Sequence, residues 1–499
     1  MKLTVEKISE VYLRIYGDPG CEQELEMFFT YEVPGARFTP KFRARLWDGK
    51  VRLYSIIRKT LYVGLFAYLV EFCKRNNYEL NFHSTEEYPK VYEPTGCTLG
   101  ETESFINSLN MHARGEPIPA RDYQIEAVKH ALDVNRAVLL SPTASGKSFM
   151  IYCLLRWHVE AGRKCIVVVP TTSLVEQMYS DFKDYSSHNG FDVSVHCQKL
   201  YSGFTRVFDK DVLITTWQSI YKQPKEWFEN FDVIVGDEAH QFKATSLITI
   251  MERLQHVKYR IGTTGTLDDK KLSQLTLEGL FGPVHRVITT KELMEQGSVV
   301  NIDISCLMLQ YSDEIRKACK DFNYQEEIDF IVTNEARNKF ITNLALSQKG
   351  VTLVLFRYIE KHGDVLYSML KNKASESTEV YYVHGGVDTM VREQIRHDAE
   401  NSGKHTVILA SYATFSTGIN IRGIENVIFA SPTKSKITNL QSIGRGLRLK
   451  DGKNLLRLYD IADDLQHKSR KNHTINHMLE RVKIYSEEKF PYKIYPIKI

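Results

Sequence analysis

Short apolar runs alternate with helical segments along most of the chain, a pattern typical of a sheet wound with helices. Runs rich in Val, Ile and Leu are typical of parallel strands that are buried on both faces. One set of such runs lies at 137–140, 164–169, 212–214, 233–236 and 259–262. A second set lies at 302–309, 351–356, 379–383, 407–410 and 426–429. The sequence therefore predicts two α/β units, one after the other.

Polar clusters follow the runs of the first set at the points where the predicted strands end. These clusters are Pro-Thr-Thr at 170–172, Thr-Thr-Trp-Gln at 215–218, Asp-Glu-Ala-His at 237–240 and Thr-Thr-Gly-Thr at 263–266. The carboxyl ends of parallel strands share one edge of a sheet, and doubly wound folds bind ligands there. We therefore expect a binding site along this edge.

The first 100 residues differ from the rest and predict a small α+β domain. Strand-like stretches lie at 3–5, 11–15 and 51–54, and helical ones at 22–29 and 65–75. The polar, turn-rich stretch 84–112 predicts a linker. We therefore divide the chain into domains 1–100, 113–298 and 299–499, the last with a C-terminal helical extension that includes a helix predicted at 475–488.

Composition indicates an ordinary globular protein, because 43% of the residues are hydrophobic and 25% are charged. No apolar run approaches the roughly 20 residues that a membrane span needs, so we expect no membrane partner. The N-terminus has no signal-peptide core. The eight cysteines are scattered without a Cys-x-x-Cys pair, which argues against a disulfide framework or a zinc site. These features predict a cytoplasmic protein.

The segment 141–148, Ser-Pro-Thr-Ala-Ser-Gly-Lys-Ser, follows the strand predicted at 137–140 and precedes an apolar helical run. Backbone N–H groups at a helix N-terminus bind anions. Gly146 allows close backbone approach, Lys147 can reach the β- and γ-phosphates of a nucleotide, and the Ser148 hydroxyl can ligate Mg²⁺. Ser141 stands where the usual phosphate loop has its first glycine. The predicted phosphate contacts are Thr143, Ala144, Ser145, Gly146, Lys147 and Ser148.

Two adjacent acids, Asp237 and Glu238, follow the apolar strand predicted at 233–236. Facing a phosphate loop, such a pair supplies a metal ligand and a base. We expect Asp237 to hold Mg²⁺ and Glu238 to orient and deprotonate the attacking water. Without a lysine such as Lys147 upstream, two acids at a strand end more often form a solvated turn or a helix cap.

The second unit has no phosphate loop of its own, but it has a helical stretch at 441–448 with two arginines. Arg445 and Arg448 are three residues apart, and we expect them to share one helix face. Two such guanidinium groups can bind a γ-phosphate held by the other unit, as arginine fingers do. A solvated basic helix face is the alternative.

Six cations between residues 37 and 52 are interleaved with Phe38, Phe42 and Trp47, against the single acid Asp48. Asp-Gly at 48–49 predicts a hairpin turn. Arg43 and Arg45 on one strand would then share a face with Lys50 or Arg52 on the other. Such a ribbon suits a nucleic-acid backbone. Alternatively it is a solvated hairpin whose aromatic residues belong to a core.

Over about residues 115–465 these motifs resemble those of the superfamily 2 helicases, and their pattern is similar to that of the RecG/XPB-like branch. Gln124 with Arg121 resembles the adenine-reading motif, and Asp-Glu-Ala-His at 237–240 is a DEAH form of the family's second motif. The segments similar to its DNA-backbone motifs contain Thr171, Thr172, Thr216 and Gln218. In the second unit, the residues in segments that resemble family motifs are Gly418, Asn420, Gln441, Arg445 and Arg448.

The resemblance implies two RecA-like parallel-sheet domains in tandem, preceded by a small N-terminal domain that binds double-stranded nucleic acid. It implies ATP and Mg²⁺ as cofactors, and catalytic roles for Lys147, Glu238, Gln441, Arg445 and Arg448. The N-terminal Trp-Asp-Gly at 47–49 and the order of parts are similar to a helicase of tailed phages. The implied activity is three-prime to five-prime movement on forks, Holliday junctions and R-loops in recombination, repair and replication. The implied setting is a monomer on DNA in the host cytoplasm, with contacts to recombination or replication proteins.

Three alternatives remain at this point. The chain could be a duplex translocase that does not separate strands, and a strand-displacement assay would distinguish it. It could be an RNA helicase, and ATPase stimulation by DNA and by RNA would distinguish that. An ATP-gated DNA clamp without turnover would lack a base or an arginine finger, whereas Glu238, Arg445 and Arg448 are all present.

Overall fold

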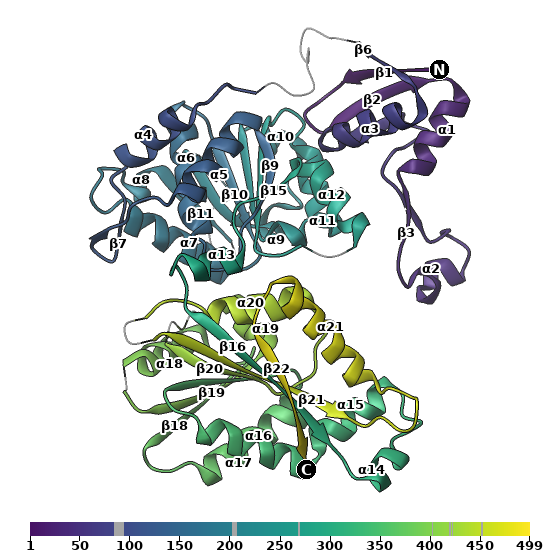
Figure 1. The fold of residues 1–499 in the computed structure, drawn as a ribbon. Coiled ribbons are helices and arrows are strands. Elements are labelled where there is room, and N and C mark those ends of the chain that lie inside the picture. The colour runs from purple at the N-terminus through teal and green to yellow at the C-terminus, as the bar shows by residue number, and fades with distance from the viewer. Residues whose placement is uncertain are drawn as a thin grey trace. The chain divides into compact units, whose positions relative to one another are not determined.

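The computed structural model of the 499-residue chain describes all residues except 84–93, 202–206, 268–269, 402, 419–420, 422 and 451–452, and describes 389, 393 and 416–418 by backbone alone. The chain divides into two compact units, one containing Met1–Ser141 and Gly146–Val287 and the other containing Pro142–Ser145 and Ile288–Ile499. In Figure 1 the first unit runs from purple to teal and the second from teal to yellow. No helix among the described residues is long and apolar enough to cross a membrane.

The N-terminal part of the first unit is a small α+β domain, as predicted. Its sheet has the order β5-β2-β1-β6. The strands are β1 Lys2–Lys7, β2 Tyr12–Gly17, β5 Thr60–Tyr62 and β6 Glu79–His83, and the helices are α1 Pro19–Phe28 and α3 Phe66–Asn76. Alternate residues of β1 and β2, such as Leu3, Val5 and Leu13, form the core beneath the helices.

The basic stretch folds differently from the predicted hairpin. Strand β4, Lys50–Arg52, pairs with β3, Thr30–Glu32, and not with the residues just before Asp48. A 3₁₀ turn, η1 Ala36–Phe38, and a short helix, α2 Pro40–Arg43, occupy the tip. Thr39 begins α2 because its hydroxyl accepts a hydrogen bond from Phe42 N, and proline suits the first helical position. The prediction that Arg43 and Arg45 share a strand face with Lys50 was therefore wrong.

The rest of the first unit is an α/β domain with seven parallel strands in the order β11-β12-β10-β13-β14-β9-β15. The strands are β9 Arg136–Leu140, β10 Cys165–Val169, β11 Cys197–Leu200, β12 Val212–Thr216, β13 Val233–Asp237, β14 Tyr259–Thr264 and β15 Val284–Arg286. The helices are α4 Leu99–Ser108, α5 Asp122–Val134, α6 Lys147–Glu160, α7 Thr172–Tyr185, α8 Val193–His196, α9 Trp217–Ile220, α10 Lys225–Phe228, α11 Thr245–Arg253 and α12 Lys271–Phe281. The domain also contains a small two-stranded ribbon, β7 His112–Ala113 and β8 Glu116–Pro117, and a 3₁₀ turn, η3 Ala239–Gln241.

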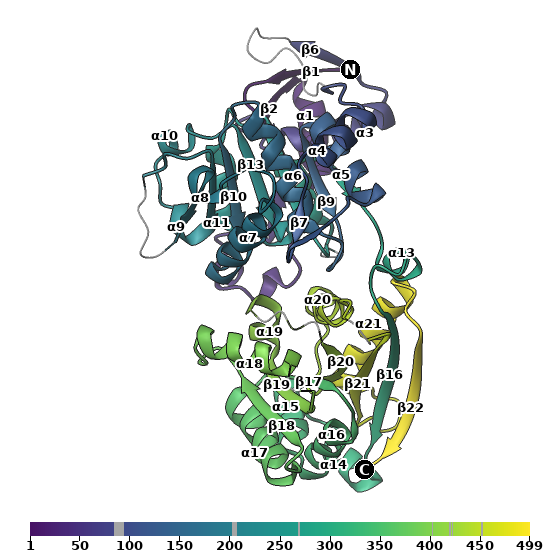
Figure 2. The same cartoon turned by 90° about the vertical axis from the view of Figure 1, so that its left-hand side faces the viewer.

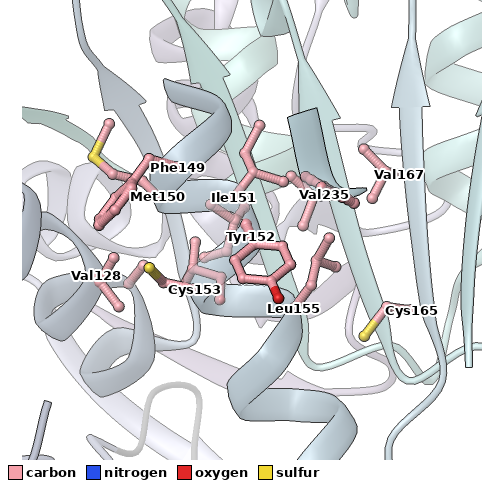
Figure 3. Packing of buried hydrophobic residues seen from close by; sticks show 14 of the residues in the cluster. Val128, Phe149, Met150, Ile151, Tyr152, Cys153, Leu155, Cys165, Val167 and Val235 are labelled. Atoms are coloured by element: carbon pink, nitrogen blue, oxygen red, sulfur yellow. The ribbon is translucent and has the colours of Figure 1, made fainter. Parts of the chain in front are cut away.

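Helix α6 is buried almost all round, which explains why its sequence is apolar without a clear polar face. Figure 3 shows its side chains packed between Val128 of α5 and the strand residues Val167 and Val235. Helix α4 lies within the stretch 84–112 that was predicted as a linker. It begins with a capping box, Thr98 with Glu101, and buries Ile106 in the same core.

The N-terminal domain is docked on the α/β domain of its own unit through buried polar contacts. The hydroxyls of Tyr12 and Tyr62 donate to Glu252 Oε1 over 2.6 and 2.7 Å. Arg136 Nη2 lies 2.6 Å from Glu10 Oε2, and both side chains are over nine-tenths buried. A Cβ on Gly64 would lie only 1.8 Å from the Glu278 carbonyl oxygen, so glycine allows this close approach.

The second unit is also a seven-stranded parallel sheet, in the order β18-β19-β17-β20-β21-β16-β22. Its strands are β16 Asn301–Gln310, β17 Val351–Phe356, β18 Thr378–Val383, β19 His405–Ser411, β20 Ile424–Phe429, β21 Leu455–Asp464 and β22 Tyr492–Lys498. Its helices are α13 Thr290–Glu295, α14 Asp313–Ala318, α15 Tyr324–Thr333, α16 Glu335–Ser347, α17 Asp364–Lys373, α18 Thr389–Asn401, α19 Tyr412–Gly418, α20 Lys436–Gly446 and α21 His473–Glu487, with a π turn, η4 Ile359–Gly363, before α17. The predicted tandem of parallel-sheet domains after a small α+β domain is thus confirmed.

The C-terminal region is part of this second sheet rather than only a helical extension. Helix α21 confirms the predicted helix, but the chain continues into β22, which pairs along β16 (Figure 2). The Arg481 guanidinium of α21 contacts the Asp460 carboxylate of β21 at 2.7 Å, and both side chains are buried. A buried ion pair of this kind fixes the helix in place, because removing either partner leaves an uncompensated buried charge.

Candidate functional site

The phosphate-loop segment connects β9 to α6 at the carboxyl edge of the first sheet. Thr143 and Ala144 form its turn, and Ala144 has a left-handed φ of 70°. Ser145 Oγ donates to the Pro142 carbonyl over 2.6 Å, and Lys147 Nζ donates to the Ser141 carbonyl over 3.3 Å. The loop therefore curves back on itself with its lysine held across it.

The backbone at position 146 favours glycine, and a larger residue there would also displace the Gln124 side chain. The φ of Gly146 is +86°, and an added Cβ would lie 2.3 Å from Gln124 Nε2. Helix α6 begins directly after it, so its first N–H groups point toward the loop. Gln124 and Arg121, predicted to read adenine, lie at the start of α5, and Gln124 is buried against this glycine. Gln124 Oε1 accepts a hydrogen bond from Arg121 N over 3.0 Å.

The two acids lie at the end of the parallel strand β13, which is separated from β9 by β14, and they have different environments. Asp237 is buried, and its Oδ1 accepts a hydrogen bond from Thr263 Oγ1 over 2.8 Å. Burial raises the pKa of the Asp237 carboxyl above its ordinary value, the Glu238 charge raises this pKa further, and the positive charge of Lys147 lowers it. Asp237 is therefore a buried carboxylate whose ionised form depends on a nearby cation.

Glu238 has a left-handed backbone, with φ of 50°, which costs a non-glycine residue on the order of 1–3 kcal/mol. Its Oε2 lies 3.3 Å from His240 Nδ1, and the same ring nitrogen lies 3.0 Å from Thr264 Oγ1. Strained backbone of this kind is typical of functional sites. His240 thus connects the acid pair to the polar cluster at the end of β14.

The residues present fit a magnesium ion that is shared with a nucleotide. Mg²⁺ prefers oxygen ligands and is often held by one or two carboxylates together with substrate phosphates. Asp237 supplies a buried carboxylate and Ser148 a hydroxyl. No group of three His, Cys, Asp or Glu side chains suited to a metal occurs in the described part of the chain. A cation here would take its other oxygen ligands from the nucleotide and from water.

Two contacts of this site were missing from the sequence analysis. Thr263 lies beside Asp237 in the strand register, and its hydroxyl orients that carboxylate. Tyr185, the last residue of α7, has its hydroxyl 2.9 Å from Ser148 Oγ and packs on Tyr152 of α6. The Thr263 position could have been inferred from its place at a strand end, whereas the sequence near Tyr185 carries no such signal.

The predicted DNA-backbone residues gather along the same edge of the sheet. Strands β10 and β12 are neighbours, and Val169 is paired with Thr216 at their carboxyl ends. Thr171 caps α7 by accepting a hydrogen bond from Leu174 N, and Thr172 is exposed in its first turn. Thr216 precedes α9, in which Gln218 is exposed. All four residues therefore lie at or just after the carboxyl ends of β10 and β12.

The arginines of the second unit are placed differently from the prediction. Helix α20 contains Gln441 and Arg445 and ends at Gly446, so Arg448 lies beyond the helix. Lys453 Nζ donates to the carbonyls of Gly446 and Arg448. The prediction that Arg445 and Arg448 share one helix face was therefore wrong.

The neighbouring helix α19 packs against the arginine segment within this unit. The Arg445 guanidinium lies 5.7 Å from the ring centre of Phe415 in α19. Gly418 ends α19, and Asn420 lies outside the described residues.

The four predicted N-terminal cations differ in their surroundings. Arg52 Nη2 lies 2.6 Å from Asp48 Oδ2, and its Nε lies 3.8 Å from Glu26. Arg43, Arg45 and Lys50 are exposed and have no ion-pair partner among the described residues. The three unpaired cations are better placed than Arg52 to bind an external anion.

Three family models match successive parts of the chain. They are "DNA helicase UvsW, N-terminal" over residues 1–83, "Type III restriction enzyme, res subunit" over 117–269 and "Helicase conserved C-terminal domain" over 333–450. The chain is 34% identical to the ATP-dependent DNA helicase uvsW of Enterobacteria phage T4, over 96% of each chain. It is 26% identical to the DNA 3'-5' translocase XPB2 of Sulfurisphaera tokodaii, over 71% of this chain and 84% of the relative. The crystal structure of T4 UvsW matches over the whole of both chains, with 31% identity and a TM-score of 0.53.

Proposed function

Since the chain belongs to the UvsW family of superfamily 2 DNA helicases, we propose that it uses ATP to remodel branched DNA. It is an ATP-dependent DNA helicase whose activity serves recombination and repair. The finer proposal concerns substrates: replication forks, Holliday junctions and R-loops. The observation that carries the chemistry is the buried Asp237 and adjacent Glu238 at a strand end, electrostatically coupled to Lys147 of the phosphate loop.

Each site residue has a role in this proposal. Lys147 and the N–H groups of 143–148 bind the phosphates, and Arg121 and Gln124 bind the adenine. Ser148 and Asp237 hold Mg²⁺, which when bound neutralises charge that develops on the phosphates. Glu238 accepts a proton from the water that attacks the γ-phosphorus, and ADP leaves as the γ-phosphoryl group is transferred.

The second unit completes the proposed cycle. Gln441, Arg445 and Arg448 contact the γ-phosphate when the two RecA-like domains close on ATP, with Gly418 and Asn420 near the nucleotide. Closure and reopening shift DNA contacts such as Thr171, Thr172, Thr216 and Gln218 relative to contacts on the other domain, which converts hydrolysis into stepping. We propose that these domains span 113–298 and 299–499 after an N-terminal domain of 1–100. The matched family models lie inside these bounds.

The cellular setting follows from the relatives. We propose that the protein works as a monomer on DNA in the cytoplasm of a phage-infected host, with contacts to recombination or replication proteins. The experiment that tests the function measures ATPase activity and strand displacement on matched fork, four-way junction, R-loop and linear duplex substrates. Branched DNA should stimulate both activities more than linear duplex. Equal rates on all four substrates would contradict the proposed specificity.

A second candidate function is duplex translocation without strand separation, which the match to a restriction-enzyme subunit over 117–269 favours. This activity would displace a triplex-forming third strand from linear duplex while leaving fork strands paired. An RNA helicase would show stronger ATPase stimulation by RNA than by DNA. Adding a triplex substrate and an RNA substrate to the panel therefore separates all three activities.

Changing Tyr185 to Phe should weaken Mg²⁺-dependent nucleotide binding by about threefold to tenfold, the effect of one lost hydrogen bond. When the Ser148 oxygen ligates a cation, its hydroxyl hydrogen needs an acceptor, and the Tyr185 hydroxyl lies 2.9 Å away. The measurement is titration of a fluorescent ATP analogue with Mg²⁺ and with EDTA. Affinity in EDTA should stay unchanged. An equal loss in both conditions would show that Tyr185 only supports packing.

Changing Arg43, Arg45 and Lys50 together to Ala should weaken DNA binding and flatten its salt dependence. Each phosphate contact contributes about 0.9 to the slope of log K against log salt, so the slope should fall by up to about three. The measurement is equilibrium binding to one duplex at several salt concentrations. Arg75→Ala is the control, because Arg75 is exposed in the same domain but paired with Glu71. An unchanged slope in the triple variant would leave these cations without a DNA role.

A further inference from the structure

The carboxyl ends of β13 and β14 place a threonine directly beside the carboxylate that is proposed to hold the cation. Asp237 is paired with Thr263 in the parallel register of these neighbouring strands. Thr263 is fully buried, and its Oγ1 donates to Asp237 Oδ1 over 2.8 Å. The Thr263 hydroxyl therefore occupies one of the two oxygens of this carboxylate.

The strand that carries Thr263 is held on all sides. Strand β14 lies between β13 and β9, and Thr263 is paired with Leu139 of β9. At the start of β14 the buried Arg260 guanidinium donates to the carbonyls of Met251 in α11 and Leu280 in α12, both over 3.3 Å. Threonine also has few χ1 rotamers, because its Cβ is branched. The direction of the Thr263 hydroxyl is therefore fixed by the fold.

The next residue of β14 has other partners and does not share this task. Thr264 Oγ1 donates to the Thr266 carbonyl over 2.9 Å and lies 3.0 Å from His240 Nδ1. Successive residues of a strand point to opposite faces, which explains why two adjacent threonines have different partners. Orientation of the Asp237 carboxylate is therefore a property of Thr263 and not of the whole polar cluster.

A carboxylate that is hydrogen-bonded in this way distinguishes between divalent cations. The hydrogen bond fixes the rotation of the carboxylate and reduces the charge that Oδ1 can share with a metal, so Oδ2 is the better ligand. Mg²⁺ demands octahedral geometry at about 2.1 Å and suits a single carboxylate oxygen. Ca²⁺ takes roughly six to eight oxygens at about 2.4 Å and often uses both oxygens of one carboxylate. A one-oxygen ligand therefore favours Mg²⁺.

From this geometry we propose that Thr263 is a positioning residue that makes Asp237 present one oxygen, and that it thereby selects Mg²⁺ over Ca²⁺ in the nucleotide site. Thr263 acts through Asp237 and does not itself contact the cation. This inference rests on the proposed function, because it concerns the cation of the same ATP site. It assigns the choice of metal to a residue that lies outside the phosphate loop and the acid pair.

The test measures the affinity of the full chain for a fluorescent ATP analogue with Mg²⁺, with Ca²⁺ and with EDTA, in the absence of DNA. Thr263→Val keeps the shape of the side chain and removes its hydroxyl. It should weaken Mg²⁺-dependent binding about tenfold, the effect of one lost hydrogen bond to a charged group. It should weaken Ca²⁺-dependent binding less than about twofold, because the freed Oδ1 becomes a second ligand. Thr263→Ser keeps the hydroxyl and should preserve the wild-type preference.

Thr406→Val is the matched control. Thr406 is a fully buried threonine of β19 in the second unit, and its Oγ1 donates to the Lys404 carbonyl over 3.3 Å. This control should leave nucleotide affinity unchanged with either cation. If thermal unfolding shows that Thr263→Val does not fold, Thr263→Ala removes the same hydroxyl and allows the same comparison. Affinity in EDTA should equal that of the wild type in every variant.

Equal losses with Mg²⁺ and Ca²⁺ would overturn the inference, because Thr263 would then support the site without choosing between cations. A loss of the same size in EDTA, or no loss with either cation, would also overturn it. The failure of this inference is distinguishable from failure of the proposed function. If branched DNA stimulates hydrolysis by the wild-type protein while Thr263→Val keeps the wild-type cation preference, then only the inference fails. The metal comparison measures binding alone and does not depend on turnover.

Discussion

Replacing Glu238 by Gln is expected to leave ATP binding intact and to reduce turnover by a factor of about 10² to 10⁴. The amide keeps the size of the side chain and can still orient a water, but it cannot accept the proton that the attacking water loses. In the proposed function Lys147 binds the phosphates and Asp237 holds the cation, and Asp237 keeps its hydrogen bond from Thr263 when Glu238 is changed. The substitution therefore separates binding from chemistry.

The measurement pairs equilibrium binding of a fluorescent ATP analogue with the rate of phosphate release in the presence of DNA. Asp237→Asn is the comparison, because losing the buried carboxylate should weaken Mg²⁺-dependent binding itself. Glu238→Gln should also trap the ATP-bound form on DNA. Hydrolysis at the wild-type rate would refute the assignment of Glu238 as the base.

Arg448→Ala should lower turnover by about three orders of magnitude, the effect of removing an arginine finger. A guanidinium can bind a phosphate with paired N–H groups, an arrangement that a lysine cannot reproduce. Arg448→Lys should therefore restore little of the lost rate. Single-turnover hydrolysis at saturating ATP and DNA is the measurement, since it reports the chemical step.

A matched control for Arg448 lies two residues further along the chain. Lys450 is also a cation of this segment, but its Nζ donates to the Glu400 carbonyl over 2.8 Å. Lys450→Ala should keep turnover within about threefold of wild type if the loss in Arg448→Ala comes from a phosphate contact. If Arg448→Ala lowers turnover less than tenfold, Arg448 has a structural role and the finger lies elsewhere.

The parallel strands and the residues at their ends were predictable because both follow from local patterns. A buried parallel strand needs a continuous Val and Ile run, as at Cys165–Val169, and the polar residues after it must lie at the sheet edge. The phosphate loop is equally local, since one glycine, one lysine and one serine define it. These patterns placed Lys147 and Asp237 in the same site.

Other features depended on competition between local signals. The alternating cations near Arg43 are typical of a strand. Thr39 and Pro40 are a helix-start signal, and the chain forms the short helix α2 there instead of a strand. Helix α20 ends at Gly446, a residue that weakens helices, and this end separates Arg448 from Arg445. The capping box of Thr98 and Glu101 was readable within the predicted linker and indicated helix α4.

Contacts between distant segments could not be predicted, because they depend on how whole elements pack. The hydrogen bond of Tyr185 with Ser148 joins residues 37 positions apart, and that of Tyr12 with Glu252 joins residues 240 positions apart. Neither tyrosine differs in its local sequence from a surface aromatic residue. Such pairs become visible only when the fold is known.

The contacts that dock the N-terminal domain on the α/β domain of its unit restrict the movement of one domain relative to the other. Glu10 is held by Arg136 of β9, and Tyr12 and Tyr62 are held by Glu252 of α11. The domain that carries the β3–β4 hairpin therefore cannot swing independently of the domain that carries the phosphate loop. In the proposed cycle, any movement of the first RecA-like domain therefore also moves the hairpin tip of the N-terminal domain by the same amount.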